Sequence, residues 1–274
     1  YKLPPGIVRE QLNNFNSVIR QNEQSLSLRV QDLEPKDLKG VYKNIDVDMR
    51  QYKRIKMFIH AESLPNRTPL PGDGSLDDLD KRMVAFMRIG TDMTENYYQI
   101  EVPLQPTPYT EGVANNLSAE EVWQPESNSI DVPFSLFTGA KAKSIQNRSL
   151  VGATYFDEEL NQIDEFTPIS SLPGDKKYKI AVRGNPTLGQ VRTLMVGVKN
   201  PSESPGDYLH GEVWFNELRL AEIDSEGGWA SVAELDTNIA DFATINLNGN
   251  ISTVGFGNID QIPNLRNLSL IHIS

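Results

Sequence analysis

The residue types that most often carry catalysis are scarce in this sequence. Histidine occurs three times, as His60, His210 and His272, and cysteine does not occur at all. The G-x-S-x-G and H-E-x-x-H patterns are absent, so nucleophilic and zinc catalysis lack their usual parts. Glu158 and Glu159 have the residue type of a glycosidase pair, but adjacent charges in a polar loop are usually only solvated. We therefore expect no enzyme, no catalytic or metal-binding residue and no cofactor.

One loop concentrates carboxylates in a way that suits a hard cation. The segment PGDGSLDDLDKR holds Asp73, Asp77, Asp78 and Asp80 close to glycine. Calcium prefers such oxygen ligands, but the spacing departs from that of the EF-hand loop. We therefore favour an acidic loop without a bound metal over a calcium site.

Aromatic residues offer a second binding chemistry, because sugar rings stack on exposed aromatic side chains. The candidates are Tyr97, Trp123 and Trp214. Packing inside the fold is the commoner fate of such residues. A secreted or surface jelly-roll module that binds carbohydrate nevertheless stays open as the alternative function.

The charge balance limits the partners. Acidic residues outnumber basic residues by 37 to 26, which gives a net charge of −11. Such a chain has no global positive field to hold phosphate groups, so we exclude nucleic acid as a partner.

The sequence has the marks of an internal fragment. It begins at Tyr1 without a charged and apolar leader, and it lacks the run of about 20 apolar residues that a membrane helix needs. After Pro263 the composition changes abruptly to NLSLIHIS, which resembles translated sequencing adapter. We expect residues 263–274 to be a non-native tail.

From residue 25 onward the dominant pattern has period two, interrupted by proline, glycine, asparagine and aspartate, which is typical of strands joined by loops. MVAFMRIG is apolar at nearly every position, which predicts a central strand covered on both faces. IDVPFSL is predicted to turn Phe134 and Leu136 inward along a strand. In GEVWFNELRL the alternation changes phase, which predicts a β-bulge near Asn216 and Glu217. The remaining predicted strands are SLSLRV, IKMFIHAE, YYQIEVPL, KYKIAV and RTLMVGV.

About eight such strands, with no helical periodicity of any length, predict an all-β fold. We expect a jelly-roll-like antiparallel β-sandwich over residues 25–224. Residues 1–24 are polar and helix-like in character, and we expect an extended or irregular lead-in there.

Residues 225–262 predict a different structure. SVAELDTNIAD and ATINLNGNIST alternate perfectly, are each about 10 residues long and are joined by a short turn, as in a transmembrane β-hairpin of a large outer-membrane β-barrel. A hairpin that packs its apolar face on the sandwich is the alternative, but an isolated hairpin is marginal in water and the jelly roll is already filled.

In the barrel interpretation the wall residues form two sets. The lumen-facing set is polar and comprises Glu234, Asp236, Asn238, Asn246, Asn248 and Asn250. The lipid-facing set is apolar and comprises Leu235, Ile239, Ile245, Leu247 and Ile251. Trp229, which follows two glycines, has the position of an interfacial aromatic residue.

Several long strings in fixed order resemble the SprA/Sov family of outer-membrane translocons. They are RQNEQSLSLRV, VYKNIDVDMRQYKRIKMFIHAES, ENYYQIEVPL, GEVWFNELRL and GGWASVAELDTNIADFATINLNGNISTVGFG, and the resemblance covers residues 1–262. That family belongs to the type 9 secretion system of Bacteroidota and is tied to gliding motility in some members. It has no catalytic residues to carry over.

The resemblance implies a giant single-chain barrel in the cell outer membrane through which folded cargo proteins leave the periplasm. It also implies accessory barrel, plug and lipoprotein subunits as partners, together with outer-membrane lipid. Bacterial barrels keep periplasmic turns short and place large insertions outside. We therefore expect an extracellular sandwich that caps or rims the pore, with residues 231–241 running inward across the membrane.

Overall fold

The computed structural model describes residues 2–7, 11–14, 17–20, 24–62, 83–107, 117–146, 152–223, 229–239, 243–253 and 270–273. The chain forms two compact units, residues 1–221 and residues 222–274. Near the start of the first unit, β1 (Gln11–Asn14) and β2 (Ser17–Arg20) pair as an antiparallel hairpin. The helix-like polar character of this region therefore did not correspond to a helix in its described residues.

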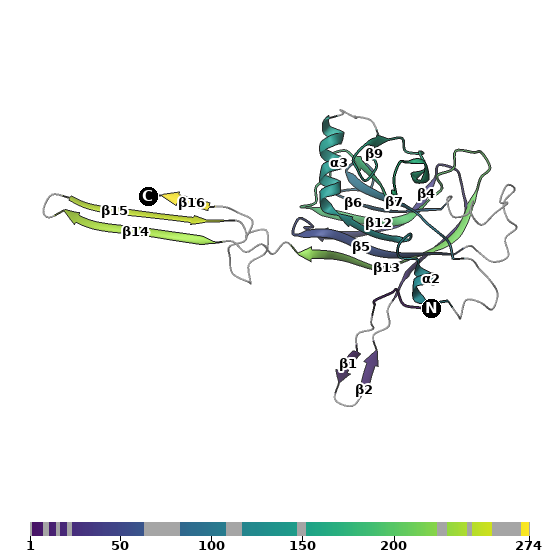
Figure 1. Cartoon of the computed structure of the whole chain (residues 1–274), viewed down its shortest axis with the longest axis horizontal. Coiled ribbons are helices and arrows are strands. Elements are labelled where there is room, and N and C mark those ends of the chain that lie inside the picture. Colours follow the sequence, from purple (N-terminus) through teal and green to yellow (C-terminus); the bar gives the residue numbers. More distant parts are fainter. Residues whose placement is uncertain are drawn as a thin grey trace. The chain divides into compact units, whose positions relative to one another are not determined.

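The rest of the first unit is a sandwich of two sheets, which lie one above the other in Figure 1. The smaller sheet has the order β3-β13-β5-β8 and the larger has the order β10-β9-β11-β7-β6-β12-β4. The smaller sheet comprises β3 (Leu26–Leu33), β13 (Leu209–Ile223), β5 (Tyr52–Glu62) and β8 (Ser129–Pro133). The larger comprises β10 (Gln162–Ile163), β9 (Thr154–Phe156), β11 (Lys179–Arg183), β7 (Tyr97–Pro103), β6 (Val84–Gly90), β12 (Val191–Lys199) and β4 (Leu38–Val47).

The strand order is that of a jelly roll. Eight strands in chain order, β3 to β8 and then β12 and β13, form the sets β3-β13-β5-β8 and β4-β12-β6-β7. Such an arrangement of eight strands in two sheets is the double Greek key of this fold. The segment between β8 and β12 adds β11, β9 and β10 beside β7. The predicted jelly-roll-like antiparallel sandwich is therefore confirmed.

The core lies between the two sheets and follows the predicted alternation. Ile55, Met57, Ile59 and Ala61 of β5 are all buried, because every second residue of a strand faces the same way. β6 is buried along both faces and lies between β7 and β12, which confirms its central position.

One jelly-roll strand, β4, was missed by the sequence prediction. It is an edge strand paired only with β12, and most of its residues are half-buried or exposed, including Tyr42 at 65%. Its composition therefore lacks the apolar stripe that marked the other strands. Seven of the eight predicted strands belong to the jelly roll, and the eighth, KYKIAV, is β11 in the added segment; the two sheets contain 11 strands in the described part of the chain.

The largest correction concerns helices. IDVPFSL was predicted as one strand, but β8 ends at Pro133 and α3 (Phe134–Gln146) begins at the next residue. The buried residues of α3 are Phe134, Phe137 and Ala140, a spacing of three that fits a helix face and not a strand. α3 packs against β5, β8 and β11, so it closes one side of the sandwich.

A second, short helix lies in the connection between β7 and β8, where no helix was predicted. α2 (Ala119–Trp123) starts with a capping box, in which Ser118 and Glu121 each satisfy the other's backbone amide. The residue that caps its C-terminal end is Gln124, whose φ of 43° is in the left-handed region. α2 therefore places Trp123, which is buried, against the smaller sheet.

Burial along β13 departs from strict alternation at Asn216, beside the predicted bulge. Val213 and Phe215 are buried, Asn216 is also buried, and Leu218 is 41% exposed. Between these positions Glu217 has φ of 53°, a left-handed conformation that bulged strands use. β3 has an irregularity of its own, because its register with β13 shifts opposite His210.

The second unit contains β14 (Ala230–Ile239), β15 (Ala243–Ser252) and β16 (Leu270–Ile273), in the order β14-β15-β16. Both pairings are antiparallel. β16 lies within the stretch that the sequence analysis set aside as a non-native tail, and it pairs with residues 249–252 of β15.

Candidate functional site

The hairpin of β14 and β15 sorts the predicted wall residues into two faces. The ladder is continuous from Ala230 opposite Ser252 to Ile239 opposite Ala243, and directly opposed residues of an antiparallel pair share a face. One face carries Leu235 opposite Leu247. The other carries Glu234 opposite Asn248. A slip of one residue would have mixed the two sets, whereas this register keeps them apart.

The complete faces follow from the same ladder. The predominantly apolar face comprises Ser231, Ala233, Leu235, Thr237, Ile239, Ala243, Ile245, Leu247, Gly249 and Ile251. The polar face comprises Ala230, Val232, Glu234, Asp236, Asn238, Thr244, Asn246, Asn248, Asn250 and Ser252. All the residues predicted for the lumen are on the polar face, and all those predicted for lipid are on the apolar face.

The hairpin leaves apolar side chains uncovered. Leu235 of the apolar face is 54% exposed, and Val232, the one large apolar residue of the polar face, is 76% exposed. Single exposed apolar residues are common on protein surfaces, so the division of the two faces matters more here than the exposure of either residue.

The open end of the hairpin is closed by Trp229 and Thr253. The amide of Trp229 donates to Thr253 Oγ1 at 2.9 Å, and the amide of Thr253 donates to the carbonyl oxygen of Trp229 at 2.9 Å. The hydroxyl of Thr253 also donates to that carbonyl at 3.1 Å. These bonds hold Trp229, whose side chain is 56% exposed, at the mouth of the hairpin.

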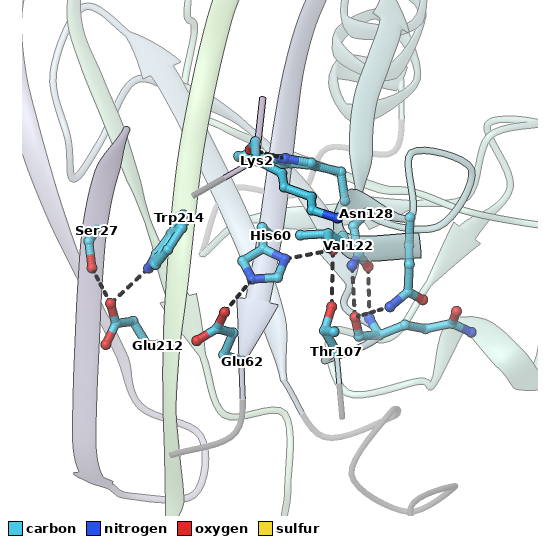
Figure 2. Close-up of polar contacts among 12 residues, drawn as sticks. Lys2, Ser27, His60, Glu62, Thr107, Val122, Asn128, Glu212 and Trp214 are labelled. Atoms are coloured by element: carbon cyan, nitrogen blue, oxygen red, sulfur yellow. Dashed lines mark hydrogen bonds and ion pairs between the residues drawn. The ribbon is translucent and has the colours of Figure 1, made fainter. Parts of the chain in front are cut away.

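In the sandwich, His60 of β5 is buried and its ring lies between two tryptophans. The ring centroids of Trp123 and Trp214 lie 5.5 and 5.2 Å away. Figure 2 shows His60 between Glu62 and the carbonyl of Val122, with Nε2 2.9 Å from Glu62 Oε1 and Nδ1 2.7 Å from the carbonyl oxygen. Because a carbonyl oxygen only accepts, Nδ1 carries a proton and fixes the orientation of the ring.

The same centre fastens two other segments to α2. The hydroxyl of Thr107 donates to the carbonyl oxygen of Val122 at 3.0 Å, and the indole of Trp123 donates to the carbonyl oxygen of Lys2 at 2.9 Å. His60 therefore stabilises packing rather than reaching a substrate. Tyr97 and Trp123, two of the three candidates for sugar stacking, are buried, and Trp214 is half-buried.

The remaining residues with possible chemistry have structural partners or lie outside the described residues. His210 Nδ1 accepts from the amide of Asp32 at 3.1 Å. Glu158 accepts from the amides of Lys177 and Tyr178, and Glu159 forms an ion pair with Lys176. The side chain of His272 and the four aspartates of the acidic loop, Asp73, Asp77, Asp78 and Asp80, lie outside the residues whose side chains are described.

The outer face of the larger sheet carries a buried ionic network. Lys199 Nζ of β12 donates to Glu101 Oε1 of β7 and to Glu165 Oε1, both at 2.8 Å. The amide of Gln99 donates to the same oxygen of Glu101 at 2.7 Å. Burial opposes the charge on Lys199, but the two carboxylates outweigh burial and raise its pKa.

Beside this network lies a cavity of about 950 Å³. Its floor includes Glu101 and Lys179, and one wall is formed by Phe166 and Ile169 from the segment added to the jelly roll. The whole lining comprises Val84, Glu101, Pro103, Gln105, Glu126, Ser127, Phe166, Pro168, Ile169, Asp175, Lys176, Lys177, Lys179, Pro201, Ser202 and Asp207.

The comparison with protein families decides the assignment of the chain. The model of the SprA_N family, described as motility related/secretion protein, matches residues 1–271. The chain belongs to the SprA_N family. The resemblance seen in the sequence is thereby confirmed, and a role related to secretion or motility follows from it. No curated protein matches the chain.

Membership of the SprA_N family is consistent with a membrane-associated protein. Among the described residues, no helix is both long enough and apolar enough to cross a membrane. The described part of the chain also holds no group of three or more histidine, aspartate or glutamate side chains placed to bind a metal ion.

Sequence reasoning missed Glu101, Lys179 and Lys199. Glu101 and Lys179 each stand between apolar residues and Lys199 follows Val198, all at positions that point away from the core. One signal was available in the sequence. β6 was predicted to be covered on both faces, so a charged residue on a strand beside it would be buried and would need a partner of opposite charge. That face is covered by the part of the added segment that contains Glu165, Phe166 and Ile169, which had no recognisable pattern.

Proposed function

We propose that the chain is a structural part of a protein-secretion channel in the cell outer membrane. In this proposal β14 and β15 are neighbouring strands of the barrel wall, and the sandwich caps or rims the pore from the extracellular side. The channel is the translocon of the type 9 secretion system of Bacteroidota, which also serves gliding motility. The family match supports the secretion role.

One observation carries the assignment of the wall, namely the register of the hairpin. Each strand has 10 residues, and a tilted strand needs about 9–11 to cross the hydrocarbon core. The register collects the leucines and isoleucines of both strands on one face and the asparagines and acids on the other. A wall between lipid and a water-filled lumen needs that division. Only residues 240–242 join the strands, which suits a periplasmic turn.

The partners follow from the same proposal. Cargo proteins pass the polar face, outer-membrane lipid covers the apolar face, and accessory barrel, plug and lipoprotein subunits bind the assembled translocon. We assign no catalytic role and no cofactor to the chain.

The test is a cysteine scan of residues 231–252 in the parent translocon in its native outer membrane, read with a water-soluble thiol reagent. The chain contributes no cysteine of its own, so each introduced thiol is measured without background from this segment. We expect labelling at every second residue. Glu234→Cys and Asn248→Cys should label, whereas Leu235→Cys and Leu247→Cys should be protected.

At two positions, the labelling expected from the face differs from the labelling expected from the hydrophobicity of the native residue. Val232 is apolar but lies opposite Asn250 on the polar face, and Thr237 is polar but lies opposite Ile245 on the apolar face. The wall assignment requires that Val232→Cys labels and that Thr237→Cys does not. Uniform labelling, or the reverse result at these two positions, would return the hairpin to a soluble role.

A further inference from the structure

The cavity beside the ionic network contains a donor and an acceptor that do not reach each other. Lys179 Nζ lies 3.9 Å from Glu101 Oε2, which is too far for a hydrogen bond. Both side chains are buried and both line the cavity. A gap of this length between two charged groups is where a bridging hydroxyl or water molecule fits.

The other contacts of the two side chains leave Lys179 Nζ able to donate a further hydrogen bond and Glu101 Oε2 able to accept one. Glu101 Oε1 already accepts from Lys199 and Gln99. Lys179 Nζ donates to the carbonyl oxygen of Glu165 at 2.6 Å, but an ammonium group has three protons to donate. Burial lowers the pKa of Lys179, with Glu101 acting in the opposite sense. A further acceptor at Lys179 would stabilise its charged form.

The charges around the floor select the class of ligand. A ligand carboxylate that bonds to Lys179 would meet Glu101 at close range, and a ligand ammonium that bonds to Glu101 would meet Lys179. A hydroxyl group accepts from one and donates to the other without a change of charge. The ionic network is already balanced, with Lys179 and Lys199 against Glu101 and Glu165, so it offers no net attraction to an ion.

The walls fit the same ligand. Gln105, Ser127 and Ser202 are neutral polar groups at the cavity, and the prolines and Ile169 supply apolar surface. The lining also carries three acids and two lysines, which nearly balance in charge: Glu126, Asp175, Asp207, Lys176 and Lys177. The strands under the floor are paired on both sides, since Glu101 of β7 lies opposite Lys179 of β11 and Phe86 of β6. An extended peptide therefore finds no free strand edge there to pair with.

We propose that this cavity is a binding site for a neutral saccharide, with one sugar hydroxyl bridging Lys179 Nζ and Glu101 Oε2. Its volume is within the range of ordinary small-ligand sites, roughly 300–1,000 Å³. The site lies on the sandwich and does not depend on the proposed role of the hairpin in a barrel wall.

The test uses the full chain and ligand-observed NMR with glucose, galactose, mannose and N-acetylglucosamine, each up to tens of millimolar. Glucuronate and glucosamine serve as charged analogues of similar shape. We expect at least one neutral sugar to bind, and its charged analogues to bind about tenfold more weakly because each leaves one floor charge facing a like charge.

Variants place the binding in this cavity. Ser202→Trp should fill the cavity and reduce binding about tenfold, while Ser135→Trp, on the exposed side of α3, should leave binding unchanged. Lys179→Met should remove the preference for neutral sugars over glucosamine, because the ligand ammonium no longer meets a lysine there. The variant leaves Lys199 paired with Glu101, so the ionic network keeps its strongest contact. Absence of binding by all four neutral sugars, equal binding of the charged analogues, or indifference to Ser202→Trp would each overturn the proposal and leave a cavity that holds only water.

Discussion

Leu235 of β14 lies directly opposite Leu247 of β15, so both belong to the same face of the hairpin. Asn248, the next residue along β15, lies opposite Glu234 on the other face. The same substitution can therefore be made at Leu247 and at Asn248, two adjacent residues on opposite faces, and the effects on assembly compared.

Leu247→Arg should impair assembly of the parent translocon, because an arginine on the lipid face costs about 2–4 kcal/mol near the membrane midplane. Asn248→Arg should be tolerated, since it enlarges a polar face that borders water. The measurement is the amount of folded translocon in the outer membrane. Equal tolerance of the two variants would contradict the wall assignment.

Asp92 should stabilise the connection between β6 and β7. Its Oδ1 accepts from the amides of Thr94, Glu95 and Asn96, and its Oδ2 accepts from the side chain of Asn96. Asp92→Ala removes all four bonds and should lower the free energy of unfolding by about 1–3 kcal/mol. Urea denaturation measures the change. Asp175→Ala, at an exposed position, is the control, and a similar loss in both variants would argue against this role.

The two described histidine side chains should differ in their contribution to stability. His60→Ala removes a buried ring between two tryptophans and leaves Glu62 without its contact, so it should cost about 2–4 kcal/mol. His210→Ala should cost about 1 kcal/mol, because that side chain is 13% exposed and its loss frees the amide of Asp32 at an exposed position. Thermal unfolding of both variants decides the order, and an equal or larger effect at His210 would show that the aromatic centre is not essential.

Acid should destabilise the sandwich through carboxylates whose pKa lies below the ordinary value. Burial opposes the charge on Glu212, but hydrogen bonds from Ser27, Trp214 and Arg29 outweigh burial and lower its pKa. A carboxylate with a lowered pKa stabilises the fold above its unfolded value and loses that effect as pH falls through its folded value. The contribution of Glu212 is therefore complete above pH 4.5, its ordinary pKa, and declines below it.

The measurement for this pH effect is the unfolding temperature between neutral pH and about pH 3. Glu212→Gln should unfold at a lower temperature than the native chain at neutral pH, and the two curves should converge in acid. Asp131 and Asp157 also have lowered pKa values, so a residual acid dependence should persist in the variant. Parallel curves across the whole range would exclude Glu212 as a source.

The sequence was sufficient for the jelly roll and for the faces of the hairpin, because both depend on period two. Every second residue from Ile55 to Ala61 is apolar in the sequence, and these four residues are buried as predicted. The ladder from Ala230 to Ser252 could likewise be drawn from alternation and the short connection. Edge strand β4 could not be found in this way, because an edge in contact with solvent needs no apolar stripe.

The ionic floor of the cavity could not be predicted for a different reason. Glu101, Lys179 and Lys199 come from three strands, and which of them are neighbours depends on the strand order of the larger sheet. The segment that covers them is held by contacts such as Lys179 to the carbonyl of Glu165, for which the sequence has no periodic signal. α3 was misassigned because Phe134 and Leu136 alternate, although Phe137 and Ala140 also fit a helix.

The pairing of β3 with β13 has a consequence for the timing of folding. Ser27 and Glu212, which form a hydrogen bond between these strands, are 185 residues apart. A chain that emerges from its N-terminus therefore carries β3 without its partner until nearly the whole domain has been produced. The apolar strand β6 waits in the same way for β12. Folds that depend on such distant pairings form slowly and expose strand edges while they wait. Among the described jelly-roll strands, only β6 and β7 pair with a strand next to them in the chain, so a factor that escorts this domain before it is complete would have to shield the other strands.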